Sequence, residues 1–102
     1  MKEDEVITAL GALAQDTRLR MLRYLVTMGE KGAPAGEIAD AVGTSASGAS
    51  FHLTTLTEAG LLQSTRQSRQ IIYRVDFAAM GALIGYLISD CCKNDPRVTS
   101  CC

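Results

Sequence analysis

Four cysteines, the only thiols in the chain, lie together at its C-terminal end. They form two adjacent pairs, Cys91-Cys92 and Cys101-Cys102, within DCCKNDPRVTSCC, residues 90–102. Consecutive Cα atoms are about 3.8 Å apart, whereas ordinary disulfide partners are roughly 4.4–6.8 Å apart, so a bridge within one pair would be strained. Two neighbouring thiolates can instead converge on one soft ion. Three thiolates suit As(III) or Sb(III), and four suit tetrahedral Zn(II) or Cd(II).

The segment between the two pairs decides whether they can meet. Pro96 disfavours a helical Asp95, so residues 93–100 are expected to fold back as a loop that brings the second pair towards the first. Three other interpretations of the cysteines stay open on residue types alone. They are a disordered tail without a function, a redox switch with disulfides between the pairs, and a Zn(II) or Cd(II) site.

Length and composition indicate one cytoplasmic domain. The chain has 102 residues, a net charge of -1 and no apolar run near the roughly 18 residues that a membrane span needs. Its first residues, MKEDEVITAL, lack the basic and apolar regions of a signal peptide. In the cytoplasm thiols stay reduced, so metal-binding or redox roles outrank structural disulfides. We expect no enzyme activity, because a thiol enzyme needs an activated nucleophile in a pocket and every thiol here lies in the tail.

Two helices joined by a tight turn are predicted in the middle of the chain. A helix over 35–42 follows a proline, which suits the first turn of a helix, and Gly43 ends it. Ser45 can cap the next helix, and Gly60 terminates it. This spacing is typical of a helix-turn-helix. The buried stripe of the second helix consists of Ala49, Leu53 and Leu56.

Further helices and a hairpin are expected on either side of this pair. Apolar residues recur at helical spacing over 4–15, and Asp16 or Thr17 can cap a second helix that stops at Gly29. After residue 60 the pattern changes to two β-prone runs, LLQSTR and QIIYRV, separated by Gln67-Ser68-Arg69. These runs predict a hairpin with a basic tip.

The last predicted helix is the most apolar element. Asp76 can cap it, and it is expected to reach about Asp90, with no charged residue between Phe77 and Ile88. These twelve residues are too few to cross a bilayer. A helix that is apolar all round is buried on more than one side. We therefore expect one side to pack on its own subunit and the other on a second subunit.

The helix that follows Ser45 carries an outer face that suits DNA. Small and hydroxyl side chains with one aromatic ring lie away from its buried stripe, and Arg66, Arg69 and Arg74 outnumber the one acidic residue nearby, Glu58. Such a face can enter a major groove. This face would discriminate weakly between base sequences by itself, so a dimer on a palindromic site is expected. A solvated face and a protein–protein interaction module are the rival interpretations. The face and its flanks comprise Ser47, Gly48, Ser50, Phe51, Thr54 and Thr55.

Three stretches resemble the ArsR/SmtB family of winged-helix repressors. TSASGASFHLTTLTEAGLL, residues 44–62, resembles the family's helix-turn-helix signature. RQSRQIIYRV, residues 66–75, is similar to its wing, with Ser68 where the family usually has glycine, and LAQDTRLRML, residues 13–22, is similar to its opening motif. The residues that match the helix-turn-helix signature are Ser45, Ser50, His52, Leu53, Leu56, Gly60, Leu61 and Leu62.

The resemblance implies a mainly α fold of the α+β class, a winged helix-turn-helix with five helices and a two-stranded β-hairpin wing in the order ααααββα. Residues 1–90 then form the DNA-binding and dimerisation domain, residues 91–102 the cysteine-rich tail, and the first and last helices the homodimer interface. The only histidine lies beside the family's DNA-facing surface, as a phosphate contact or a hydrogen-bonded helix residue rather than a metal ligand or catalytic base. Candidate DNA-binding residues are Ser45, Ser47, Gly48, Ser50, Phe51, His52, Thr55, Arg66 and Arg69.

The resemblance also implies an inducer. The Cys-x-Cys site of some arsenite sensors is missing, because Pro34 and Gly36 stand there, and the last helix lacks the His and acidic ligands of the zinc-type sensors. The remaining candidate ligands are Cys91, Cys92, Cys101 and Cys102. From the family's behaviour we expect As(III), inorganic or methylated, or Sb(III), with Zn(II), Cd(II) or thiol redox as alternatives and no permanent cofactor. The predicted function is a repressor that releases its double-stranded operator when the inducer binds.

Overall fold

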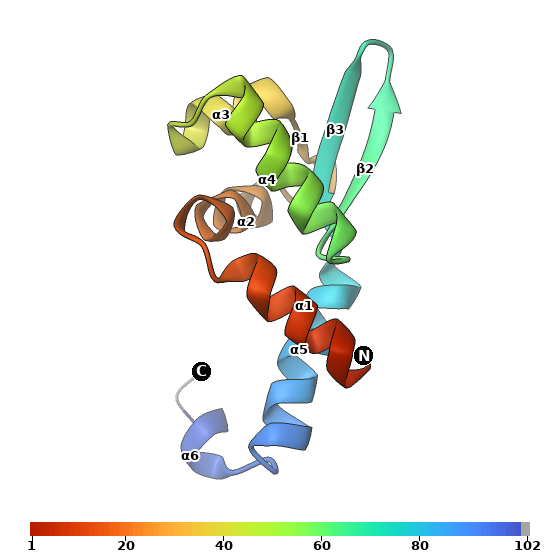
Figure 1. Cartoon of the computed structure of the whole chain (residues 1–102). Helices are drawn as coiled ribbons and strands as arrows, with labels where there is room; N and C mark the ends of the chain where they lie inside the picture. Colours follow the sequence, from red (N-terminus) through yellow and green to blue (C-terminus); the bar gives the residue numbers. More distant parts are fainter. Residues whose placement is uncertain (101–102) are drawn as a thin grey trace.

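The computed structural model describes residues 1–100, so Cys101 and Cys102 lie outside the described residues. A small antiparallel sheet lies at one side of the helices, and the hairpin of that sheet projects beside them (Figure 1). The expected winged helix-turn-helix is confirmed, with two added elements, a third strand and a sixth helix. The bounds are α1 Glu3–Leu13, α2 Asp16–Met28, β1 Ala33–Pro34, α3 Ala35–Val42, α4 Ala46–Glu58, β2 Leu62–Gln67, β3 Gln70–Val75, α5 Phe77–Tyr86 and α6 Pro96–Thr99, with a 3-10 turn η1 over Gly29–Lys31 and a π-helical turn η2 over Leu87–Cys91.

The junction between α1 and α2 differs from the prediction by about two residues. α1 ends at Leu13 rather than 15, and Gln15 caps α2 by accepting a hydrogen bond from the Arg18 backbone N–H at 2.8 Å. The expected cap at Asp16 or Thr17 is therefore wrong. Asp16 is already helical, and its carboxylate pairs with Arg20 at 3.2 Å one turn later.

The helix-turn-helix has the predicted bounds because its signals are local. α3 ends at Gly43, which adopts the left-handed conformation with φ of 71°. Ser45 then caps α4, since its Oγ accepts the backbone N–H of Gly48 at 3.0 Å. Ala49, Leu53 and Leu56 are fully buried, so the predicted stripe is the inner face of α4.

The sheet has the strand order β1-β3-β2, and both pairings are antiparallel. Gln67 pairs with Gln70, so a two-residue turn of Ser68 and Arg69 joins the wing strands, and Ser68 has a positive φ of 56°. β1 was not predicted, because it is two residues long and forms only by pairing with β3. A Cβ at Gly32 would collide with the Tyr73 carbonyl oxygen, so glycine permits this close pairing.

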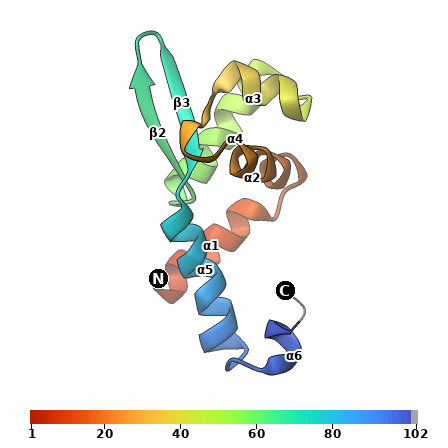
Figure 2. The same cartoon turned by 180° about the vertical axis from the view of Figure 1, so that it is seen from behind.

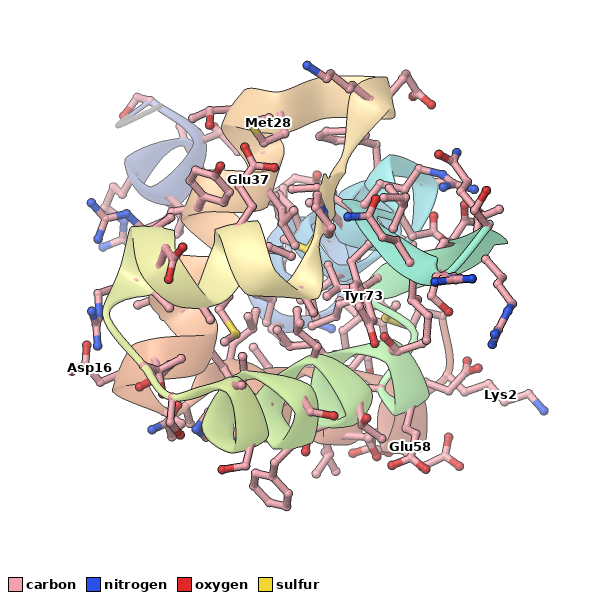
Figure 3. All side chains as sticks on the ribbon, turned by 90° about the horizontal axis from the view of Figure 1, so that it is seen from above. Lys2, Asp16, Met28, Glu37, Glu58 and Tyr73 are labelled. Carbon is pink, nitrogen blue, oxygen red and sulfur yellow. The ribbon has the colours of Figure 1, made fainter. Side chains whose placement is uncertain are left out.

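One core holds the helices and the base of the sheet together. Tyr73 of β3 points towards the middle of the molecule, whereas Glu58 lies at its rim (Figure 3). α5 enters the core mainly through Leu83 and then leaves the body of the protein (Figure 2). The largest fully buried side chains are Met21, Leu25, Ile38, Leu53, Leu56 and Leu61.

The segment after α5 is more regular than the loop expected over residues 93–100. The helix continues through η2, in which the Cys92 N–H bonds to the Leu87 carbonyl at 3.0 Å. Lys93 and Asn94 have positive φ values of 52° and 56°, and the chain turns back there. Asp95 then caps α6, so the expected reversal occurs through a helix cap rather than through an irregular loop.

Candidate DNA-binding surface and thiol tail

The outer face of α4 presents hydroxyl groups and one aromatic ring. Phe51 is 65% exposed, and Ser47, Ser50 and Thr54 are also exposed. Within residues 1–100, the hydroxyls of Ser50 and Thr54 make no hydrogen bond, so they are available to another molecule. Thr55 is half-buried and its hydroxyl donates to the Phe51 carbonyl at 3.1 Å. Thr54 is therefore better placed for contact than Thr55.

The N-terminal turn of α4 brings three predicted residues together. Ser45 Oγ lies 3.4 Å from Ser47 Oγ and accepts the N–H of Gly48. A Cβ at Gly48 would lie 2.8 Å from Thr44 Oγ1, closer than side chains tolerate. A small residue thus keeps this turn open, and the first helical N–H groups with their partial positive charge favour a phosphate nearby.

His52 is a hydrogen-bonded residue of α4. Its Nδ1 lies 3.1 Å from Arg18 Nη1. A guanidinium group only donates, so Nδ1 accepts and the ring proton resides on Nε2. Burial and the positive charge of Arg18 lower the pKa of His52 below its usual value of 6.5, which favours the neutral ring. Arg18 Nε also donates to the Ala12 carbonyl at 2.6 Å, so this one side chain joins α1, α2 and α4.

Sequence reasoning did not assign Arg18 a role. Its partner His52 is 34 residues away, and no local pattern indicates such a contact. The signal was present only as a matched arginine in the opening motif LAQDTRLRML. Arg18 is thus a positioning residue, because it fixes the end of α1 against α4.

The wing supplies positive charge beside α4. Arg66 and Arg69 are exposed, whereas Arg74 is half-buried and donates to Thr65 Oγ1 at 2.7 Å. A shallow depression of about 300 Å³ separates the wing from the helix-turn-helix, and it brings the predicted residues Ser50 and Arg69 to one place. Its lining consists of Pro34, Ala35, Gly36, Ser50, Arg69, Gln70, Ile71 and Tyr73.

Charge on this surface matches a polyanion. Residues 41–57 contain no Asp or Glu, and the nearest carboxylate along α4 is Glu58 in its last turn. The carboxylates of Glu3, Asp4 and Glu5 lie instead in the first turn of α1. A groove without carboxylates, flanked by wing arginines, suits a phosphate backbone.

The first cysteine pair lies at the end of η2, where Cys91 is the last residue of the turn and Cys92 is its C-cap. Cys91 is exposed, Cys92 is half-buried, and both are free thiols. Within residues 1–100, no group of three or more His, Cys, Asp or Glu side chains is placed to hold a metal ion. Of the four cysteines predicted as ligands, the structure places Cys91 and Cys92 side by side in the chain, and Cys101 and Cys102 lie outside the described residues.

Two helices, α1 and α5, expose apolar side chains away from the outer face of α4. Ile7 and Leu10 of α1 are 64% and 40% exposed, and Phe77 and Ile84 of α5 are 42% and 51% exposed. α1 and α5 cross in the lower part of the molecule (Figure 1). The apolar last helix thus has one side in its own core and another side uncovered within a single chain.

The chain is similar in sequence to known helix-turn-helix proteins. A helix-turn-helix domain family matches residues 13–65. The HTH-type transcriptional regulator YgaV of Escherichia coli K12 is 33% identical over 84 residues, which are 82% of this chain and 83% of YgaV. Residues 1–100 contain no helix that is both long and apolar enough to cross a membrane.

Solved structures agree with the fold. An ArsR-like transcriptional regulator from Rhodococcus sp. RHA1 has a TM-score of 0.77 and 26% identity, covering 95% of this chain and 89% of its own. A homodimeric winged helix-turn-helix domain from Mycobacterium bovis has a TM-score of 0.66 and 31% identity, and the match covers 79% of this chain and 75% of that domain. A possible transcriptional regulator for arsenical resistance has a TM-score of 0.67 and 34% identity, and the match covers 76% of this chain and 77% of that protein.

Proposed function

The chain belongs to the ArsR-type helix-turn-helix family of DNA-binding transcriptional regulators, and from that premise we propose that it is a homodimeric, As(III)-responsive repressor. In the repressing state α4 of each protomer lies in the major groove of one operator half-site, and the wing arginines contact phosphates. Trivalent arsenic or antimony binds the C-terminal thiolates and releases the operator.

The DNA-binding part of the proposal is supported by the α4 surface and the wing. Ser50 of α4 and Arg69 at the wing tip line the same depression, and no Asp or Glu is among its lining residues. Phosphate contacts from Ser, Thr and Arg side chains position a protein on the duplex. The neutral His52 adds one donor, Nε2–H, on α4.

The dimer is supported by exposed apolar surface and by the Mycobacterium bovis relative, which is homodimeric. Ile7 and Leu10 on α1, with Phe77 and Ile84 on α5, provide the apolar area that a subunit interface buries. A two-fold dimer presents two copies of α4 to a palindromic operator.

The inducer assignment is carried by the position of the thiols. Cys91 is the last residue of η2, which continues α5, the helix that we assign to the dimer interface; Cys92 follows it, and the chain then turns back at Lys93 and Asn94. Soft thiolates select arsenic and antimony over hard cations. A site at this position couples ligand binding to the arrangement of the two protomers. The relative described as an arsenical resistance regulator is consistent with this chemistry.

Fluorescence anisotropy with a labelled fragment of the protein's own promoter tests the proposal under reducing, anaerobic conditions. As(III) should weaken operator binding of the wild type by about 5- to 150-fold, the usual range of allosteric coupling. The Cys91→Ser, Cys92→Ser double variant should bind the operator normally and lose the response. Ser89→Ala, in the same turn, is the matched control and should respond like the wild type.

Two further titrations separate the alternatives. Release by Zn(II) or Cd(II) but not by As(III) would assign a different metal, and release by a thiol oxidant that dithiothreitol reverses would assign a redox switch. Single Cys101→Ser and Cys102→Ser variants identify the third ligand. If the double variant at Cys91 and Cys92 still releases DNA on arsenite addition, the proposed inducer site is wrong.

A further inference from the structure

The base-reading chemistry of α4 is restricted to a narrow set of contacts. Between Ala46 and Glu58 the helix contains no Arg, Lys, Asn or Gln. Bidentate hydrogen bonds to guanine require Arg or Lys, and those to adenine require Asn or Gln. α4 therefore lacks the side chains that make the commonest specific contacts in the major groove. Any sequence preference of this helix must come from hydroxyl groups, from the Nε2–H of His52 or from apolar contact.

Phe51 is the largest apolar side chain exposed on this face of α4. It is 65% exposed, and exposed hydroxyl residues lie one turn away on either side, at Ser47 and Thr54. An exposed aromatic ring gains free energy when a partner covers it. The ring is also held in place, because it packs edge to face against His52 with centroids 5.3 Å apart. Arg18 fixes His52 in turn through the 3.1 Å hydrogen bond.

Charge identifies the occupant of this face as DNA rather than a second protein or a membrane. Residues 41–57 carry no acidic side chain, and the exposed wing arginines Arg66 and Arg69 follow α4 in the chain. Among the base edges in a major groove, the apolar group is the 5-methyl group of thymine. An apolar ring among hydroxyls, on a helix without Arg, Lys, Asn or Gln, is complementary to that methyl group.

We infer that Phe51 reads a thymine 5-methyl group in each operator half-site and is the main specificity-determining residue of α4. The inference rests on the proposed DNA binding but is independent of the inducer. It predicts an operator with a required thymine in each half-site, at a position where cytosine is accepted only when it is methylated at C5. Guanine and adenine are read weakly, because no side chain of α4 forms a bidentate pair with them.

The test removes one methyl group at a time from the DNA. Nuclease footprinting first defines the part of the promoter fragment that the wild type covers. Each thymine in that part is then replaced in turn by deoxyuridine, which lacks only the 5-methyl group, and the affinity for each DNA is measured by fluorescence anisotropy. Replacing the contacted thymine should weaken binding about fourfold in one half-site and roughly 15-fold in both, as expected for loss of one buried methyl group per contact. The other thymines should tolerate the change.

Variants of Phe51 assign the effect to this side chain. Phe51→Ala should bind the thymine operator more weakly than the wild type and should bind thymine and deoxyuridine operators equally. Phe51→Leu keeps an apolar group and should retain part of the discrimination. Val26→Ala is the matched control, because Val26 is 46% exposed but lies on α2; it should behave like the wild type.

The outcomes separate this inference from the proposed function. If the wild type binds the promoter fragment but no thymine responds to deoxyuridine, or if Phe51→Ala discriminates as strongly as the wild type, the inference is wrong and the DNA-binding function stands. If the wild type shows no salt-dependent binding to its own promoter, both are wrong. Thermal melts of each variant confirm that the protein remains folded.

Discussion

Replacing Arg18 with alanine should destabilise the protein more than its position at a helix start suggests. The side chain donates to the Ala12 carbonyl at 2.6 Å and to His52 Nδ1 at 3.1 Å, and it is half-buried. Hydrogen bonds to a charged group contribute about 1.5–3 kcal/mol each. Water reaches both acceptors once the side chain is gone, so the sum must be discounted. We expect the free energy of unfolding to fall by about 2–3 kcal/mol.

Arg23 provides the control within the same helix. It is exposed and makes no hydrogen bond or ion pair among residues 1–100, so Arg23→Ala should change the free energy of unfolding by less than about 0.5 kcal/mol. Arg18→Lys keeps the charge but cannot reach both acceptors with one planar group. It should therefore lose most of the stabilisation, which a purely electrostatic role would retain.

Urea denaturation at pH 7.5 and a fixed protein concentration measures these differences, because the stability of a dimer depends on protomer concentration. A double-mutant cycle between Arg18 and His52 isolates their bond. Its coupling energy should be about 1 kcal/mol at pH 7.5 and should decrease as acid protonates His52, because a protonated ring no longer accepts a hydrogen bond at Nδ1. If Arg18→Ala costs no more than Arg23→Ala, the link between α1 and α4 is not a stabilising contact and the reasoning fails.

Three further predictions concern other parts of the molecule. Gly32→Ala should reduce the free energy of unfolding by about 3 kcal/mol, because the added Cβ meets the backbone of β3 and Gly32 has a positive φ of 66°. Gly36→Ala is the control in the same urea titration. A Cβ there has open space around it, so the variant should stabilise α3 slightly. The pKa of His52 is lower in the folded state than in the unfolded state, so as pH falls the unfolded chain takes up the proton before the folded chain does. The free energy of unfolding should therefore fall as pH drops below about 6.5. Urea titrations from pH 7.5 to 5 should show a smaller fall for His52→Gln than for the wild type. Ile84→Asp should shift sedimentation equilibrium towards monomer, and Val26→Asp, at a comparably exposed position on α2, should not.

The helix-turn-helix and the wing could be predicted because each boundary has a local signal. Ser45 caps α4 through its own hydroxyl, Gly43 takes the left-handed conformation that ends α3, and two β-prone runs flank a polar turn. α6 also had a local signal that was interpreted only as a turn. Asp95 followed by Pro96 is an N-cap with proline at the first helical position.

Other features depend on contacts between distant residues and could not be predicted. β1 forms only because β3 lies beside it, and the Arg18–His52 bond joins residues 34 positions apart. The cap of α2 was predicted at Asp16 or Thr17 because their side chains are better caps than glutamine. Gln15 takes the position because α1 ends early and its longer side chain reaches the Arg18 N–H.

The position of the thiols relative to the core determines how an inducer can act. No residue from 87 to 100 is buried, and Leu83 is the last buried residue of α5. A ligand at Cys91 and Cys92 would therefore change few contacts inside its own protomer. A ligand shifts the equilibrium between a DNA-binding and a released state only when it binds the two states with different affinities. In the proposed dimer those states would differ at the exposed apolar faces of α1 and α5. Because Arg18 fastens α1 to α4 within each protomer, a rotation at the proposed interface would move α4 as part of a rigid body and change the spacing between the two proposed half-site contacts.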